Sequence, residues 1–382
     1  MKFEIDRGSF LQTIQAVIGV IERRQTMPIL SNFHIEASDT GLRVTGTDLE
    51  LELVSHVQAQ IDQPGAVTVP ARKLFDICRG LPEGSVIRAE LTEQKFIVRS
   101  GRSRFTLATQ PATEFPSLGD IDSAERHAIP NLALRQVLNR TMFAMAQQDV
   151  RYYLNGLLLA LRRDRLRAVA TDGHRLAMSD VDVELDLAEE RQVIVPRKGV
   201  LELNRLLSDE DETVSVSLTN NHLQVDLGTI LFTTKLIDGR FPDYEKVVPV
   251  GGDKILTGDR EVIRQALARA AILSNEKFRG VRLVLDPGLL KLQTENPEHE
   301  EAEEEIEVDY DGAPLEIGFN VNYLLDALGV MEGEAFKFAM SSPDAGGLLT
   351  EMGTDAHKSG VIPIRLVRRG ELVSWVLRYP RL

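Results

Sequence analysis

The stretch "TVPARKLFDICRGLPEG" at residues 68–84 recurs as "IVPRKGVLELNRLLSDE" at residues 194–210. Both begin with a β-branched residue and Val-Pro, and a basic pair and apolar residues at helical spacing follow. A weaker third copy, "IGFNVNYLLDALGVMEG" at residues 317–333, has Asn320 where the first two copies have proline. The three anchor positions are 126 and 124 residues apart, which indicates an internal repeat of about 125 residues.

Other landmarks recur with the same step. Segments with one apolar face open the copies at residues 10–21, 132–146 and 261–273. Alternating, strand-like segments follow at residues 41–53, 165–178 and 289–308. We therefore predict an α+β fold of three repeated domains, each with two helices, several strands and its own core. The predicted domains span residues 1–124, 125–252 and 253–366, and an atypical C-terminal extension follows at residues 367–382.

Composition narrows the class of protein. The chain has 382 residues, a net charge of −14 and a single cysteine, Cys78, so an intramolecular disulfide is excluded. The sequence predicts no signal peptide and no membrane-spanning run, and we expect a soluble cytoplasmic protein. The acidic balance argues against nucleic-acid capture by the whole surface, unless the basic residues gather on one face.

The segment "ATDGHRLA" at residues 170–177 resembles a catalytic centre, because Asp172 and His174 lie close to Arg175. A catalytic pair would need a nucleophile or a metal, and the sequence has no HExxH, no GxSxG, no phosphate loop and no Cys/His cluster. The first copy has "TDLELE" at this position, without a histidine. We therefore predict a turn in which Asp172 bonds nearby backbone, with no catalytic residue, metal or cofactor. A binding role stays open for His174, Arg175 and Leu176.

Two charged runs have opposite signs. Residues 295–309 carry nine acidic side chains, whereas "KFIVRSGRSRF" at residues 95–105 is basic with no acid. The acidic run alone fits a solvated loop or a metal-binding patch. Because both runs alternate as strands do, they also fit two sheet edges that pair, with charge selecting the partner. Within one chain this pairing would close a small ring, and between chains it would be head-to-tail.

Basic residues recur at equivalent helix starts and loops: Arg23, Arg24, Arg72, Lys73, Arg197, Lys198, Lys277, Arg279 and Arg282. Each alone fits a solvated surface charge, but their recurrence predicts one positive face in every domain. The neighbouring "QQDVRYYLNG" at residues 147–156 adds Tyr152 and Tyr153, which suit either phosphate and base contact or packing at a core edge.

Residues 1–366 resemble the bacterial replicative sliding clamp, the β subunit of DNA polymerase III. The resemblance is carried by residues 68–84, 147–156, 169–177 and 193–200 and by "IVRSGRSRF" (97–105), "DGRFPDYEKV" (238–247), "AILSNEKFRGVRL" (271–283) and "IPIRL" (362–366). It implies a head-to-tail homodimer that closes a six-domain ring, with helices lining the hole and sheets outside. Such a ring encircles duplex DNA, confers processivity and is not catalytic. The implied partners are double-stranded DNA, the DNA polymerase III α subunit, the clamp loader and DNA repair proteins that carry a short clamp-binding peptide.

The resemblance also implies three sets of site residues. DNA contacts are expected at Arg24, Arg72, Gln148, Tyr152, Tyr153 and Lys198. A partner-peptide pocket is expected at Leu154, Thr171, Gly173, His174, Arg175, Leu176, Pro242, Lys246, Val247, Val361, Ile362, Pro363, Ile364 and Arg365. The dimer interface is expected to pair Lys73, Arg102 and Arg104 with Glu300, Glu301, Glu303 and Glu304 around Phe105, Leu107, Ile272 and Leu273.

This chain departs from the family pattern in two places. Lys246, Ile362 and Ile364 stand where the pocket usually has an arginine and methionines. The extension at residues 367–382, with the only tryptophan, follows where the family usually ends, and it fits a disordered tail, a sequence artefact or a segment that folds onto the pocket. Two other functions remain open from the residues alone: a nuclease or hydrolase that uses Asp172 and His174 with a metal on the acidic run, and an interaction scaffold with no role on DNA.

Overall fold

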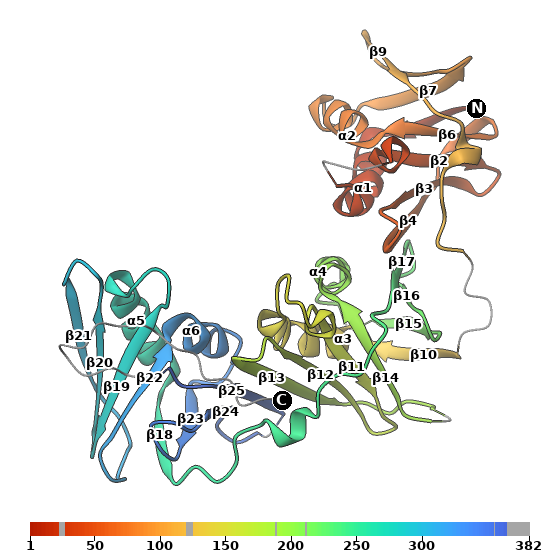
Figure 1. The fold of residues 1–382 in the computed structure, drawn as a ribbon. Helices are drawn as coiled ribbons and strands as arrows, with labels where there is room; N and C mark the ends of the chain where they lie inside the picture. The colour runs from red at the N-terminus through yellow and green to blue at the C-terminus, as the bar shows by residue number, and fades with distance from the viewer. Residues whose placement is uncertain (23–26, 120–124, 188, 211, 355, 365–382) are drawn as a thin grey trace. The chain divides into compact units, whose positions relative to one another are not determined.

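The computed structural model describes residues 1–22, 27–119, 125–187, 189–210, 212–354 and 356–364 (Figure 1). The chain forms two compact units. Unit one comprises Met1–Arg135, Leu185–Leu187 and Lys198–Asp238, and unit two comprises Gln136–Glu184, Ala188–Arg197 and Gly239–Leu382. Each unit therefore combines one end repeat with part of the middle repeat. The domain boundary predicted at residue 124 and the extension at 367–382 lie outside the described residues.

Unit one contains an eight-stranded antiparallel sheet that runs from the second repeat into the first. Its order is β10 (Glu125–Pro130), β15 (Thr213–Leu218), β16 (His222–Asp226), β17 (Ile230–Lys235), β4 (Leu51–Val57), β3 (Gly41–Thr47), β2 (Asn32–Ser38) and β6 (Gly65–Pro70). A five-stranded sheet has the order β5 (Gln60–Gln63), β1 (Lys2–Asp6), β7 (Val86–Thr92), β8 (Lys95–Ser100) and β9 (Ser103–Ala108). The pairing of β17 with β4 joins the two repeats, with Phe232 opposite Leu53.

Unit two repeats this plan. Its eight-stranded sheet has the order β14 (Arg191–Pro196), β11 (Gly156–Leu161), β12 (Arg165–Thr171), β13 (Arg175–Asp182), β25 (His357–Val361), β24 (Gly347–Glu351), β23 (Ala335–Met340) and β18 (Lys254–Asp259). A four-stranded sheet has the order β21 (Glu301–Glu307), β20 (Leu289–Glu295), β19 (Gly280–Asp286) and β22 (Leu315–Asn320). The pairing of β13 with β25 joins the second and third repeats.

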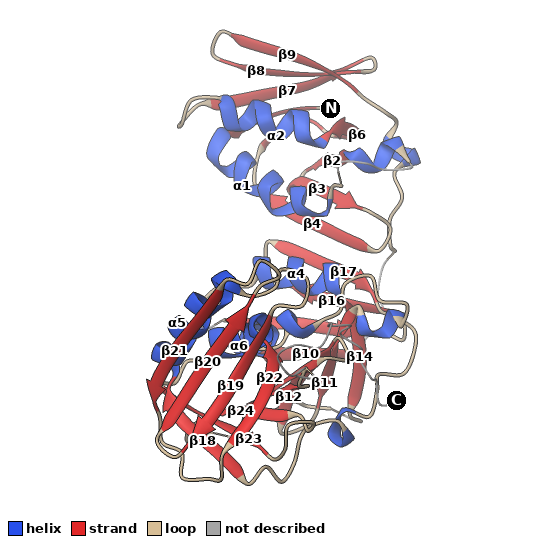
Figure 2. Cartoon of the chain, turned by 60° about the vertical axis from the view of Figure 1, so that its left-hand side comes forward, coloured by secondary structure: helices blue, strands red, loops and turns tan. Residues whose placement is uncertain are grey.

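Each repeat supplies two helices, as the sequence predicts: α1 (Arg7–Val17) and α2 (Ala71–Gly80), α3 (Asn131–Asn139) and α4 (Arg197–Leu206), and α5 (Arg260–Ala270) and α6 (Val321–Gly329). Figure 2 shows α5 and α6 behind the four-stranded sheet of unit two, and α5 packs on β20 and β21. Asp6 and Asp259 begin α1 and α5 by accepting a hydrogen bond from the backbone N–H three residues on. The repeated sequence pattern therefore encodes repeated local structure.

The helix predicted over residues 132–146 is shorter than expected. It ends at Asn139, and a 3₁₀ turn, η4 (Met142–Ala144), follows. Just after this end, the Thr141 hydroxyl donates to the Val137 carbonyl at 2.6 Å. The helices predicted at 10–21 and 261–273 also end early, with the 3₁₀ turns η1 (Ile18–Val20) and η7 (Ala271–Leu273).

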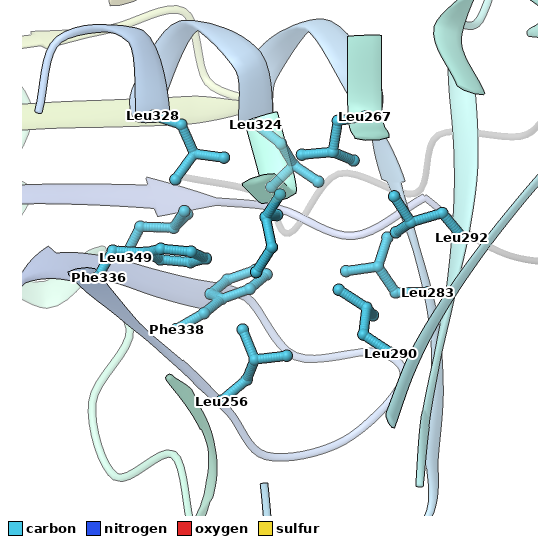
Figure 3. A pocket seen from close by; sticks show the side chains of 11 residues that line it. Leu256, Leu267, Leu283, Leu290, Leu292, Leu324, Leu328, Phe336, Phe338 and Leu349 are labelled. Carbon is cyan, nitrogen blue, oxygen red and sulfur yellow. The ribbon is translucent and has the colours of Figure 1, made fainter. Parts of the chain in front are cut away.

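The core of the third repeat encloses a small cavity of about 20 Å³, which Figure 3 shows between the helices and the strands. Its walls are leucines and two phenylalanines, Phe336 and Phe338, together with Ile263. Because no polar atom lines it, a water molecule would find no hydrogen-bond partner there. The cavity is a packing gap and offers no ligand site.

Two further observations bear on the class of protein. No helix among the described residues is both long and apolar enough to cross a membrane. The Cys78 side chain is buried, and its burial raises the pKa of the thiol to about 12. A thiol with so high a pKa stays protonated and unreactive.

Candidate functional site

The segment that resembled a catalytic pair is a tight turn between β12 and β13. One carboxylate oxygen of Asp172 accepts the backbone N–H groups of His174 at 2.9 Å and of Arg175 at 3.0 Å. Gly173 has φ +87°, a left-handed conformation that favours glycine, and the Thr171 hydroxyl donates to the Arg175 carbonyl at 2.7 Å. The predicted turn is confirmed. Both carboxylate oxygens of Asp172 accept hydrogen bonds from this turn, so Asp172 is not available as a general base.

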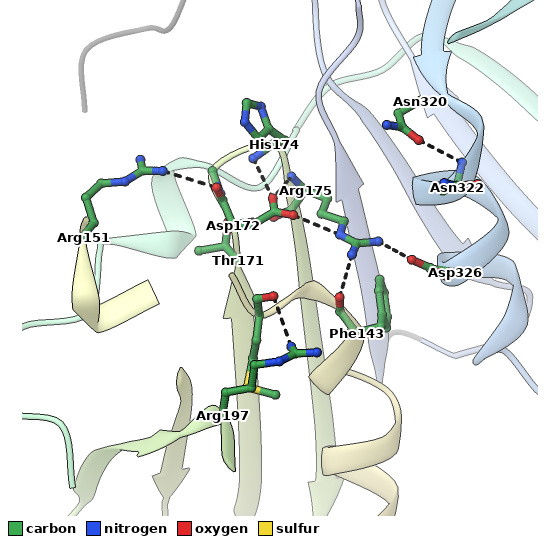
Figure 4. A network of polar contacts seen from close by, with 12 residues as sticks. Phe143, Arg151, Thr171, Asp172, His174, Arg175, Arg197, Asn320, Asn322 and Asp326 are labelled. Carbon is green, nitrogen blue, oxygen red and sulfur yellow. Dashed lines mark hydrogen bonds and ion pairs between the residues drawn. The ribbon is translucent and has the colours of Figure 1, made fainter. Parts of the chain in front are cut away.

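The guanidinium of Arg175 is held by both repeats of unit two (Figure 4). It donates to Asp172 Oδ2 at 3.2 Å, to Asp326 Oδ2 at 2.5 Å and to the Phe143 carbonyl at 2.7 Å. The ring of Tyr323 lies 4.5 Å from its Cζ atom, and the ring of Phe143 lies at 5.3 Å. Since the side chain is only 13% exposed, these contacts occupy nearly all of its surface.

A second arginine supports the same turn. Arg151 forms a two-bonded ion pair with Asp149, at 3.0 and 2.9 Å, and also donates to the Asp172 carbonyl at 3.3 Å. These bonds from Arg151 lower the pKa of Asp149 to about 2. Nearby, burial and the positive charge of Arg175 lower the pKa of Arg197. The turn is thus surrounded by fixed charges that stay ionised near neutral pH.

Several of the predicted partner-pocket residues lie at the β13–β25 junction. Arg175 lies opposite Val361 in the ladder, and the Ile362 N–H continues it by donating to the His174 carbonyl at 2.9 Å. The Tyr244 hydroxyl accepts from Arg167 of β12 at 3.2 Å, which brings the turn η6 (Tyr244–Lys246) to the same sheet.

The predicted partner-pocket residues differ in how far their side chains are exposed. Buried positions are Leu154, Thr171, Leu176 and Val361. Half-buried positions are Gly173, His174, Arg175, Pro242, Val247, Pro363 and Ile364. Lys246 and Ile362 are exposed, and Arg365 lies outside the described residues. The surface therefore offers apolar side chains beside fixed polar groups, a combination that suits peptide or small-molecule binding.

The predicted DNA contacts are spread over both units. In unit one, Arg72 donates to the Ile21 carbonyl at 2.8 Å, and Lys198 lies against the carboxylates of Glu22 and Asp48. In unit two, Gln148 is exposed, Tyr152 is 59% exposed, and Tyr153 is half-buried with its ring 5.9 Å from that of Tyr152. Arg24 lies outside the described residues. These contacts stay predictions, and Lys198 would have to exchange its two carboxylates for a phosphate.

Both charged runs form strands at sheet edges. The basic run forms β8 and β9, and the acidic run ends in β21; β9 and β21 are the outer strands of their sheets. Exposed charges on or next to these edge strands are Arg102, Arg104, Glu300, Glu301 and Glu303, and Lys73 is exposed on helix α2. Glu304 is different, because it is half-buried and pairs with Arg269 of α5 at 2.7 Å. Of the predicted apolar set, Leu107 is buried, Phe105 and Leu273 are half-buried, and Ile272 is 76% exposed.

The sequence analysis did not identify four residues that contact Arg175 or its turn: Phe143, Arg151, Tyr323 and Asp326. For two of these residues, comparison of equivalent positions in the repeats could have pointed to them. Asp326 and Tyr323 fall 124 residues after Glu202 and Gly199 of α4, so α6 differs from its counterpart at the two positions that meet Arg175. Among the described residues, no group of three or more histidine, cysteine, aspartate or glutamate side chains is arranged to hold a metal ion.

Comparison with known proteins gives one consistent answer. The family models for the N-terminal, central and C-terminal domains of the DNA polymerase III beta subunit match residues 1–119, 128–243 and 245–365. The chain is 52% identical to a beta sliding clamp of Pseudomonas putida and 46% identical to that of Escherichia coli, each time over 96% of this chain and 100% of the relative. It also matches the sliding clamp of Pseudomonas aeruginosa bound to griselimycin, at 51% identity and a TM-score of 0.92, over 96% of this chain and all of that chain. The chain therefore belongs to the family of DNA polymerase III beta subunits, the bacterial sliding clamps, which serve the polymerase as accessory subunits and are not enzymes.

Proposed function

We propose that this chain acts as a head-to-tail homodimer that closes a ring around duplex DNA in the cytoplasm. Its partners in this proposal are the DNA polymerase III α subunit, the clamp loader and repair proteins that carry a short clamp-binding peptide. The opposite charge of the two free sheet edges carries the proposal. Two identical chains could pair β9 of one with β21 of the other twice, which closes a ring and covers both of these edges.

The side chains on the two edges support this pairing. Arg102 and Arg104 are exposed at the β9 edge, and β21 presents glutamates at alternate, exposed positions from Glu301 to Glu307. Because alternate residues of a strand share one face, these carboxylates form a single negative row. Ile272, 76% exposed on η7 beside β20, would become buried in such an interface.

Light scattering on a size-exclusion column tests the pairing at micromolar concentration. The wild-type chain should elute at twice its chain mass of 42.5 kDa. The double variant Arg102→Glu, Arg104→Glu should elute as a monomer, because like charges would then face each other across the edge. Adding Glu301→Arg and Glu303→Arg to the same chain should restore the dimer.

Two further chains complete the test. Arg43→Glu with Lys246→Glu, two exposed cations on neither edge, should leave the dimer intact. A chain that ends at Leu366 separates an effect of the extension from one of the edges. If the Arg102→Glu, Arg104→Glu variant stays dimeric, the assignment of the interface to these edges is wrong.

The partner-binding surface in this proposal comprises the turn at 171–176, residues 242–247 and residues 361–365. A sliding clamp that is 51% identical to this chain is described as bound to griselimycin, and we propose that this compound binds the same surface here. Loss of griselimycin binding on Ile362→Asp, at an exposed position of this surface, with the dimer mass unchanged, tests this assignment. Arg24, Arg72, Gln148, Tyr152, Tyr153 and Lys198 are the proposed DNA contacts, and such contacts should be weak and exchangeable because a sliding ring must not grip one sequence.

A further inference from the structure

Arg175 is expected, from the family resemblance, to line the partner surface, but its contacts assign it another task. Its Nε, Nη1 and Nη2 groups all donate to protein acceptors, and aromatic rings lie against the guanidinium. Three of its five N–H groups are thus used within the protein, and the side chain is 13% exposed, so a bound partner has little access to this guanidinium. Displacing its carboxylate partners would be costly, because it leaves a largely buried charge unpaired.

These contacts join two repeats. Asp172 and Phe143 belong to the second repeat, whereas Asp326 and Tyr323 belong to α6 of the third. Asp326 is the only charged residue of α6, whose sequence is VNYLLDALG. It therefore supplies the only charge by which α6 holds the turn.

The same turn fixes the surface proposed for partner binding. The His174 carbonyl accepts the Ile362 N–H at 2.9 Å, and Arg175 lies opposite Val361. Two residues on, the Ile364 N–H donates to the Gly318 carbonyl of β22 at 2.7 Å. A shift of Arg175 would thus be passed directly to Ile362, which is exposed on that surface.

We propose that Asp326 is a positioning residue for partner binding: through Arg175 it holds the 171–176 turn against residues 361–364, and it need not touch the partner itself. This inference rests on the proposed function for the identity of the surface. It adds that the surface is assembled by α6, an element that contributes no residue to the predicted pocket.

The test compares Asp326→Asn with Glu261→Gln in the full chain. Each change removes one carboxylate charge from the third repeat, and the two side chains are equally exposed, at 44% and 45%. Glu261 pairs with Arg264 within α5 and so serves as the matched control. Two quantities are measured: the dissociation constant for griselimycin, and hydrogen–deuterium exchange of the Ile362 amide.

We expect Asp326→Asn to weaken griselimycin binding about tenfold and to speed exchange at Ile362 about fivefold. Glu261→Gln should leave both quantities at their wild-type values. In an Arg175→Gln background, Asp326→Asn should have no further effect on the dissociation constant, because its only route to the surface is gone.

Each other outcome has a defined meaning. Unchanged exchange at Ile362 in Asp326→Asn would overturn the inference, as would an equal loss of affinity in the presence and absence of Arg175. If the wild-type chain binds no griselimycin while Asp326→Asn still speeds exchange, the positioning role stands and the ligand assignment of the proposed function fails. A control variant that matches Asp326→Asn in both quantities would show a general loss of charge and would also overturn it.

Discussion

The turn "TDLEL" in unit one and the turn "TDGHR" in unit two occupy the same place in the repeat but join their repeats differently. In both, the threonine hydroxyl donates to the carbonyl four residues on, and the aspartate accepts two backbone N–H groups. In unit one a cation of helix α4, Lys198, reaches the turn aspartate, Asp48. In unit two the turn supplies the cation, Arg175, and helix α6 supplies the aspartate.

One feature is common to both junctions. Among the described residues, the ion pairs between repeats take their cations from the second repeat: Lys198 with Glu22 and Asp48, Lys235 with Glu50, Arg140 with Glu332 and Glu351, and Arg175 with Asp326. The middle repeat is thus the donor to both neighbours. This direction of charge would disfavour pairing a repeat with the wrong neighbour, since like charges would then meet.

The largest expected difference between the junctions lies in burial. Arg140 is 7% exposed between Glu332 at 3.0 Å and Glu351 at 3.7 Å, and Glu351 is itself 6% exposed. Arg140→Met should lower the free energy of unfolding by about 3–5 kcal/mol, because it leaves a buried carboxylate without its cation. Urea unfolding measures this change.

The matched change in unit one is Lys198→Met. Asp48 is as buried as Glu351, at 7% exposed, but Lys198 itself is 35% exposed, so water can reach the cation of this pair. We expect a smaller loss than for Arg140→Met, about 1–2 kcal/mol, because less of the pair is withdrawn from water. Equal losses in the two variants would contradict the contrast between a buried and an accessible junction.

A smaller effect should appear as pH dependence near the unit two junction. Burial, helped by the nearby charge of Arg140 and opposed by Glu351, lowers the pKa of His357 to about 4. Because the folded pKa lies below the ordinary value of 6.5, the fold favours neutral His357. Its contribution is complete above pH 6.5, declines as the pH falls towards 4 and reaches a loss of about 3 kcal/mol below that.

The measurement is urea unfolding between pH 8 and pH 4 for the wild type, His357→Gln and His299→Gln. The wild type and His357→Gln differ in their free energy of unfolding, and this difference should shrink by about 3 kcal/mol as the pH falls, whatever its value at pH 8. His299, whose side chain is 86% exposed, is the control and should leave the pH profile unchanged. A wild-type profile parallel to that of His357→Gln would contradict the assignment.

The sequence predicts the features that repeat along the chain and those that depend only on neighbouring residues. The three α+β repeats, the turn at Asp172 and the two edge strands follow from spacing, turn chemistry and alternation, and the structure confirms them. Which charges meet does not follow, because the partners are far apart in the chain: Arg175 and Asp326 are 151 residues apart, and Lys198 and Asp48 are 150 apart. The helix predicted to Ala146 ends at Asn139 and gives way to the 3₁₀ turn η4, a break that the periodicity of apolar residues does not register.

The smallest expected effect concerns the third residue of each turn, Leu49 and Gly173, at φ +77° and +87°. A leucine in this left-handed conformation is strained by about 1 kcal/mol, whereas glycine is not. Gly173→Ala should therefore destabilise the chain by about 1 kcal/mol. Its new Cβ would also lie 2.9 Å from Arg151 Nη2, although that long side chain can move aside.

The reverse change, Leu49→Gly, relieves strain but exposes the surface that a half-buried leucine covered, so the two terms should nearly cancel. Thermal unfolding of both variants gives the difference. Suppose Gly173→Ala loses stability and Leu49→Gly loses almost none. The two turns then have the same backbone conformation, and unit two keeps glycine because Arg151 fills the space beside it. Equal losses would mean instead that the leucine side chain is as necessary to the first junction as the Arg151 contact is to the second.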